Sequence, residues 1–128
     1  MLIKGDVMNR YTKEDLEEAL LIISSIISRC EKAQPKFAEG TSHHTLLTNR
    51  INAMYVSKSL ITDGNGRDKY TKGELVEALR PIYSVISKCE KAKLKFAEGA
   101  SHYTRSKKML NAMYIAKSLI IDEISKIS

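Results

Sequence analysis

The chain has 128 residues and a formal net charge of +6, with a hydrophobic fraction of 43% and a charged fraction of 28%. This length suits one cooperative domain and is too short for two ordinary ones. No apolar run approaches the roughly 20 residues that a membrane-spanning helix needs, and the N-terminus lacks the apolar stretch of a secretory signal. We therefore expect a cytoplasmic protein that does not enter a membrane.

One stretch of the chain occurs twice. Residues 10–63 (copy one) and residues 69–122 (copy two) align without gaps at an offset of 59, and 32 of the 54 aligned pairs are identical. This identity indicates a tandem duplication with residues 64–68 as a linker. Because a copy of this size is too small for a stable core, we expect the two copies to share one domain over residues 1–128.

Each copy begins with a capping motif followed by a long amphipathic helix. Thr12 is followed three positions later by Asp15, and Thr71 by Glu74, which is the spacing of a capping box. Behind each cap, apolar residues recur every three or four positions, so that one helix face is apolar. In copy one these residues are Leu16, Ala19, Leu20, Ile23, Ile26, Ile27, Cys30, Ala33 and Phe37.

A short turn is expected in the middle of each copy. Gly40 and Gly99 can adopt the left-handed conformation that ends a helix, and Ser42 and Ser101 can cap the helix that follows. A turn of a few residues forces two helices into a hairpin. Each copy is therefore predicted to form an αα-hairpin.

Two prolines lie within the predicted helices. Pro35 and Pro81 occupy different repeat positions, and the other copy has Leu94 and Ile22 at those positions. A proline in a helix interior removes one backbone hydrogen bond. Since aliphatic residues replace the prolines, we expect both prolines to kink their helices rather than to end them.

The fold class follows from the unpartnered apolar face of each hairpin. One hairpin has nothing to bury this face against, whereas two hairpins can close on each other. The predicted fold is all-α: an antiparallel four-helix bundle made of two tandemly duplicated αα-hairpins with pseudo-twofold symmetry. Apolar residues at Ile124 and Ile127 predict that the last helix continues as a tail to residue 128.

The sequence contains no motif for a phosphate loop, a zinc site or a di-iron bundle. The Asp-Gly-Asn-Gly segment that starts at Asp63 fails as a calcium loop, because no register supplies both the ligands and the central glycine. His43 and His102 each follow a glutamate by four residues, but a glycine interrupts the spacing, and a role in covering the turn is preferred to metal binding. We predict no catalytic, cofactor-binding or metal-binding residues.

Two further pairs of equivalent residues have a structural and a functional interpretation. Cys30 and Cys89 lie on the apolar face, which favours buried thiols over nucleophiles and makes a disulfide unexpected. Asn52 and Asn111 belong to a shared Asn-Ala-Met-Tyr motif. A buried asparagine that fixes helix register is preferred to an active-site role.

The excess of positive charge lies in copy two, which has eleven Lys or Arg residues and five Asp or Glu, whereas copy one has seven of each. If the hairpin closes, several basic side chains gather near one end of the bundle and their fields add. The candidate phosphate contacts are Lys93, Lys95, Arg105, Lys107 and Lys108. This arrangement supports nucleic-acid binding by the second hairpin as an alternative function.

Leu46 and Leu47 of copy one correspond to Arg105 and Ser106 of copy two. An exposed leucine at this position would form a patch for self-association or for a protein partner. Our leading hypothesis from the sequence is a non-enzymatic protein-interaction or structural module without a cofactor.

Overall fold

A computed structural model describes residues 11–63 and 69–127. This part of the chain is entirely helical, and it contains no strand. The predicted linker at 64–68 and the first ten residues lie outside the described residues. The elements are α2 (Lys13–Ala33), the short 3-10 helix η1 (Gln34–Lys36), α3 (Ser42–Asp63), α4 (Lys72–Lys95) and α5 (Ser101–Ile127).

Both predicted capping boxes are confirmed. The Thr12 hydroxyl accepts a hydrogen bond from the Asp15 amide, and the Asp15 carboxylate accepts one from the Thr12 amide, both at 3.0 Å. Thr71 and Glu74 form the same reciprocal pair at the start of α4, at 2.9 and 3.1 Å. The first helix of each copy therefore begins at the same repeat position.

The two prolines act differently. Pro35 does not lie inside a kinked helix as predicted, because α2 ends at Ala33 and Pro35 belongs to η1. Proline lacks the amide hydrogen that would continue the α-helical hydrogen-bond pattern. Leu94 has no such restriction, and α4 runs on to Lys95. Pro81 lies inside α4, which stays one helix through it, in agreement with the prediction that it is not a boundary.

The predicted turns form, with a correction to their caps. Gly40 and Gly99 have φ values of 91° and 94°, as a left-handed glycine requires, but they lie in the turn three residues beyond Phe37 and Phe96, where the backbone is already extended. Ser42 and Ser101 are the first residues of α3 and α5, not their caps. In copy one the Thr41 hydroxyl takes the capping position, 3.3 Å from the amide nitrogen of His44.

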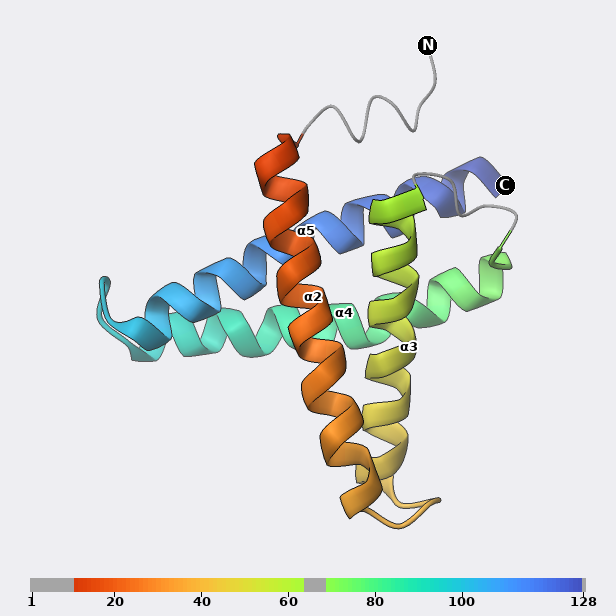
Figure 1. The fold of residues 1–128 in the computed structure, drawn as a ribbon, viewed down its shortest axis with the longest axis horizontal. Helices are drawn as coiled ribbons and strands as arrows, with labels where there is room; N and C mark the ends of the chain where they lie inside the picture. Colours follow the sequence, from red (N-terminus) through yellow and green to blue (C-terminus); the bar gives the residue numbers. More distant parts are fainter. Residues whose placement is uncertain (1–10, 64–68, 128) are drawn as a thin grey trace.

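Figure 1 shows α2 and α3 side by side, joined at one end by their turn, and α4 and α5 arranged in the same way. The two pairs cross each other, and helices of one pair contact helices of the other. The all-helical fold class is thus confirmed, with four long helices in the described residues and packing compatible with a bundle. The helix pairs do not share one common axis.

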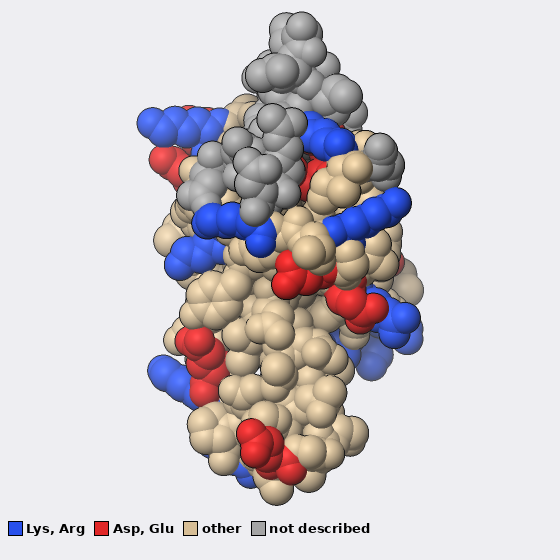
Figure 2. All heavy atoms as spheres, turned by 90° about the vertical axis from the view of Figure 1, so that its right-hand side faces the viewer, with Lys and Arg blue, Asp and Glu red and all other residues tan. Residues whose placement is uncertain are grey.

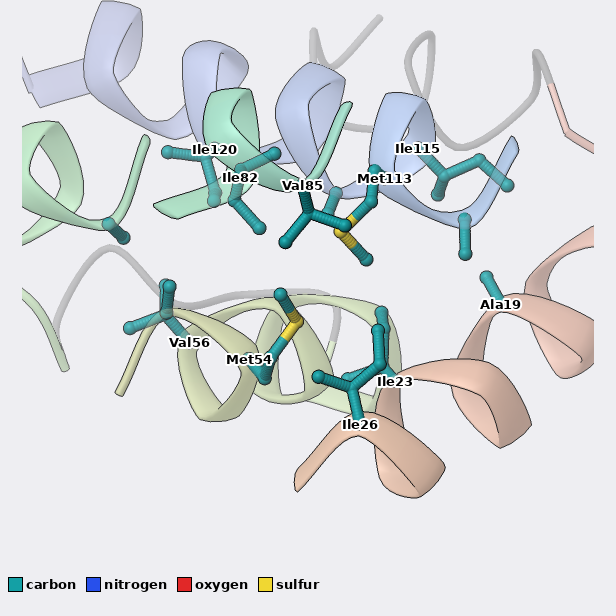
Figure 3. Close-up of a cluster of buried hydrophobic side chains, with 14 of the residues drawn as sticks. Ala19, Ile23, Ile26, Met54, Val56, Ile82, Val85, Met113, Ile115 and Ile120 are labelled. Carbon is teal, nitrogen blue, oxygen red and sulfur yellow. The ribbon is translucent and has the colours of Figure 1, made fainter. Parts of the chain in front are cut away.

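The core lies where the two helix pairs cross, and all four long helices contribute to it. Figure 3 shows Ile23, Ile26 and Met54 from α2 and α3 facing Ile82, Val85 and Met113 from α4 and α5. Met54 and Met113 occupy equivalent repeat positions, and both are fully buried at 0% exposure. The two copies therefore present the same residue type to the middle of the core.

The predicted tail at the end of the last helix is present as far as Ile127. Its buried acidic residues Asp122 and Glu123 meet Lys126, whose ammonium nitrogen lies 2.9 Å from an Asp122 carboxylate oxygen and 3.5 Å from one of Glu123. No helix in the described residues combines the length and apolarity needed to cross a bilayer.

Candidate functional site

Two of the five basic residues predicted to hold phosphates line one cavity, and the other three are not part of its lining. Arg105 and Lys108 line a cavity of about 330 Å³ between α2 and α5, the α2–α5 cavity. Lys93 instead lies over the ring of Tyr103, with its ammonium nitrogen 5.7 Å from the ring centre. Lys95 and Lys107 are exposed. Lys108 also approaches Glu18 at 3.8 Å, which reduces the charge that it offers to a ligand.

Leu46 and Leu47 line different pockets. Leu46 is 44% exposed and borders a groove of about 670 Å³ between α3 and α4, the α3–α4 groove. Leu47 is partly buried against the core and lines another cavity. The shared apolar patch therefore stays a prediction, with Leu46 as its exposed member.

An open pocket of about 420 Å³, the central cavity, lies where the two helix pairs meet and is lined by all four long helices, with Arg29 and Lys88 exposed to solvent. Its wall is mostly apolar, and it includes two thiols, one hydroxyl and three basic side chains. The lining residues are Ile26, Arg29, Cys30, Leu47, Arg50, Val85, Lys88, Cys89, Ala92, Ser106 and Met109.

The charged side chains that line the central cavity all have one sign, although the nearby Glu31 and Glu90 act to raise the pKa values of Cys30 and Cys89. Arg29, Arg50 and Lys88 line it, and none of its lining residues is acidic. The Nε and Nη2 atoms of Arg50 are buried and make no hydrogen bond in the described part of the chain. An unpaired buried charged donor is unfavourable, since it loses contact with water and gains no partner. The central cavity therefore has a surplus of positive charge and of unused donors.

Most positions that line the central cavity come in equivalent pairs, one from each copy. Ile26 pairs with Val85, Arg29 with Lys88, Cys30 with Cys89 and Leu47 with Ser106 at the offset of 59. The remaining pair, Arg50 and Met109, differs in charge. The side of the cavity formed by copy one therefore has a positive charge at a position where the side formed by copy two has none.

Cys30 and Cys89 are free thiols and buried, at 7% and 6% exposure, as predicted. Burial raises the pKa of both thiols because the thiolate loses solvation, while the positive charge of Arg50 opposes this by lowering both pKa values. A raised pKa keeps a thiol protonated and therefore a weak nucleophile. Arg50 and both cysteines line the same cavity.

The α3–α4 groove contains Asn52 and Tyr55 from the shared motif. Asn52 is exposed, and so is Asn111, so the prediction of a buried asparagine that fixes helix register is wrong. These residues lie at the edge of the apolar face, where a small rotation of the helix decides burial. Tyr55 donates its hydroxyl hydrogen to Glu31 at 2.9 Å, and this bond raises the pKa of the Tyr55 hydroxyl.

The histidines cover the turns, as the preferred interpretation predicted. The ring of His43 stacks on that of Phe37 with centres 5.0 Å apart, and His102 stacks on Phe96 at 4.8 Å. Within the described residues, no group of three or more His, Cys, Asp or Glu side chains could hold a metal ion.

Sequence reasoning missed Arg50 as a candidate. The signal lay in the repeat alignment, in which Arg50 is aligned with Met109, an apolar residue. Figure 2 shows that lysine and arginine are scattered over the face it views, and that the turn end of α2 and α3, at the bottom, is mostly uncharged. The basic character of the central cavity is a local property of its lining.

Comparisons of the chain with protein-family models, with curated proteins and with solved structures find no match.

Proposed function

We propose that this protein is a non-enzymatic binding module whose central cavity takes a small anionic ligand. The observation that carries this proposal is the lining of the cavity, in which three cationic side chains meet no acidic one. Binding sites for small molecules are concave and mostly apolar, with a few polar groups that fix orientation. The central cavity has this composition, and its polar groups select negative charge.

A negatively charged ligand would offset the repulsion among the cationic side chains that line the cavity. Like charges that face one cavity repel one another, and water weakens this repulsion at the exposed Arg29 and Lys88. An anion placed among Arg29, Arg50 and Lys88 offsets this repulsion and supplies an acceptor for the unpaired donors. Binding is the role favoured over catalysis, because the two thiols in the lining have raised pKa values and the lining contains no carboxylate or imidazole to act as a base.

Duplication of a hairpin that first paired with a second copy of itself accounts for the position of the cavity. In this proposal the two antiparallel hairpins are related by a pseudo-twofold axis that passes near Met54 and Met113. The support is a set of paired features. The bond from Tyr55 to Glu31 has its equivalent in the bond from Tyr114 to Glu90 at 2.6 Å, and both turns carry the same ring stack.

Thermal unfolding of the full chain tests the proposed function. Benzoate, octanoate and inorganic phosphate are each added at constant ionic strength, with octylamine as the ligand of opposite charge. At least one anion is expected to raise the melting temperature, because a ligand that binds only the folded state stabilises it. Equal shifts with octylamine and octanoate, or no shift with any of these anions, would contradict an anion site.

Two variants of the same net charge separate a site from a general charge effect. Arg29→Gln removes one positive charge from the central cavity, and Lys32→Gln removes one from an exposed position on the same helix. Arg29→Gln is expected to weaken the anion-induced shift, and Lys32→Gln to leave it unchanged. If both variants reduce the shift equally, the anions act on the overall charge of the protein.

Nucleic-acid binding is the second candidate, and one observation favours it. The α2–α5 cavity shares Arg29 and Met109 with the central cavity, so the basic lining continues outward to Arg105 and Lys108. A phosphate backbone that follows this path would bind with a strong dependence on salt. A mobility-shift titration decides: a complex that weakens with added salt and with Arg105→Gln/Lys108→Gln supports this candidate, and the absence of any complex removes it.

A further inference from the structure

Arg50 presents two unused donors with a defined geometry. Nε and Nη2 lie on the same edge of the planar guanidinium group, so their N–H bonds are close to parallel. Both atoms are buried and unpaired in the described part of the chain. Two parallel donors match the two oxygens of a carboxylate or a phosphate, and such a two-point pair is stronger and more directional than a single hydrogen bond. The edge therefore lacks an oxyanion partner.

The location of Arg50 fits a ligand in the central cavity. Arg50 lines both this cavity and the α3–α4 groove, and its charge acts on Cys30 and Cys89, which line the cavity from α2 and α4. The two buried nitrogen atoms are closed from water, so in this conformation they do not face the open volume. The long side chain has several rotatable bonds, so a rotation of its end can turn the unpaired edge toward an entering ligand.

The rest of the lining defines the body of that ligand. Aliphatic side chains from all four long helices surround the open volume: Ile26, Leu47, Val85, Ala92 and Met109. A volume of about 420 Å³ falls at the lower end of the range for small-molecule sites, which is roughly 300 to 1,000 Å³. An inorganic ion alone would leave this apolar surface uncovered. A short apolar body would cover it and gain the free energy of burial.

The unequal pair of Arg50 and Met109 gives the ligand a direction. Arginine stands on the α3 side of the cavity and methionine on the α5 side. Of these two side chains, only the arginine can donate hydrogen bonds to an oxyanion, whereas the methionine offers an apolar surface. This pair therefore favours one orientation of a ligand that has a charged end and an apolar end.

We propose that the central cavity binds one small amphipathic oxyanion, with its head group on Arg50 and its apolar body toward Met109. This inference rests on the proposed function and adds the ligand class, its orientation and the residue that selects it. Arg29 and Lys88 add positive charge near the mouth, where both are exposed. Carboxylates and phosphate monoesters share the chemistry that Arg50 recognises.

The test measures binding of octanoate, octyl phosphate and inorganic phosphate to the full chain by calorimetry. Octanoate and octyl phosphate are expected to bind with one site per chain, and inorganic phosphate to bind more weakly than octyl phosphate. The ratio of octanoate affinity to octyl phosphate affinity then tells whether the site prefers a carboxylate or a phosphate. Inorganic phosphate that binds as tightly as octyl phosphate would contradict the apolar body.

Variants at Arg50 test the head-group contact. Arg50→Met copies the residue of the other repeat and is expected to weaken binding by roughly tenfold to a hundredfold, which is the value of a charge-assisted hydrogen-bond pair. Arg50→Lys keeps the charge but not the two-donor edge, so its affinity is expected to lie between those of the wild type and of Arg50→Met. Wild-type affinity in Arg50→Met overturns this inference. If Arg50→Met binds as the wild type does but Arg29→Gln binds more weakly, the central cavity is still an anion site and only the role of Arg50 is wrong.

An exchange variant keeps the test independent of simple damage to the fold. Arg50→Met/Met109→Arg moves the guanidinium to the equivalent position on α5 and keeps the composition of the cavity. It is expected to bind octanoate more tightly than Arg50→Met alone, in the reverse orientation. A folded exchange variant that binds no better than Arg50→Met would contradict a head-group role that depends on position in the cavity.

The two cysteines of the chain report occupancy directly, because both line the central cavity. Octanoate is expected to slow the reaction of Cys30 and Cys89 with a disulfide reagent in the wild-type protein. In Arg50→Met the rates with and without octanoate are expected to be nearly equal. Binding measured by calorimetry without any protection of these thiols would place the ligand elsewhere and overturn the inference.

Discussion

Tyr11 donates its hydroxyl hydrogen to Ser118 at 3.0 Å, although 107 positions separate them in the chain. The bond joins the residue before the first cap of copy one to the middle of α5 in copy two. Tyr11 also packs partly buried against the core. It therefore links the two helix pairs through both a polar and an apolar contact.

Tyr11→Phe isolates the polar contact. The ring and its packing remain, and Ser118 loses one partner, so the free energy of unfolding is expected to fall by about 1 kcal/mol. Urea denaturation followed by circular dichroism measures this change. Tyr83→Phe is the matched control, since its ring is 45% exposed and keeps its contact with Lys117. Equal losses in both variants would mean that the Tyr11 bond contributes nothing specific.

Arg50→Met is expected to stabilise the ligand-free protein. The substitution removes buried donors that have no partner, and the cost of such a group is about 1 to 3 kcal/mol. Met109 shows that methionine is accommodated at the equivalent position of the cavity. The measurement is the free energy of unfolding without added anions other than chloride. Arg29→Met, at an exposed position, should change stability much less, and a lower stability of Arg50→Met than of wild type would show that the guanidinium is well paired.

The two thiols make stability depend on alkaline pH. Their pKa values lie above the ordinary 9.0 in the folded chain, so above pH 9.0 the unfolded chain loses protons that the folded chain retains. The free energy of unfolding is therefore expected to fall as pH rises from 9.0 toward the folded pKa values. Below this range the thiols are protonated in both states, so they cause no change of stability with pH. Denaturation curves at a series of pH values follow this decline.

The control for this pH dependence is Cys30→Ala/Cys89→Ala, which retains the tyrosine and lysine titrations of the wild type. Its stability should decline less steeply above pH 9.0, even if its stability at neutral pH is lower. Parallel curves for the two proteins would show that the thiols ionise equally in the folded and unfolded chains.

Pro81→Ile places the residue of the first copy into α4. Isoleucine supplies the missing amide hydrogen, so a gain of up to about 3 kcal/mol in the free energy of unfolding is expected. The reciprocal variant, Ile22→Pro, removes a helical hydrogen bond from α2 and is expected to lose about as much. Unchanged stability in Pro81→Ile would show that α4 already compensates for its proline.

The parts of the fold that depend on near neighbours could be read from the sequence. The capping boxes at Thr12 and Thr71 need only residues three positions apart, and the left-handed turns need only Gly40 and Gly99. Apolar periodicity identified the buried faces, including both cysteines. These features are local, so no knowledge of the tertiary arrangement was required.

The parts that depend on how the helix pairs cross could not be predicted. The crossing follows from the shapes of the packed side chains, which periodicity does not contain. Asn52 lies beside the apolar face and proved exposed, whereas Arg50 lies at a similar margin and has two buried nitrogen atoms. Which marginal residue becomes enclosed depends on the opposite helix pair. The candidate site therefore became visible only when all four long helices were in place.

The crossing also means that the buried surface between the helix pairs belongs to neither pair alone. Cutting the backbone outside the helices would leave that surface intact, so fragments made separately should find each other in a mixture and reassemble. A molecule seated at the crossing touches both fragments and would tighten their union, which makes this small protein a natural starting point for a split sensor.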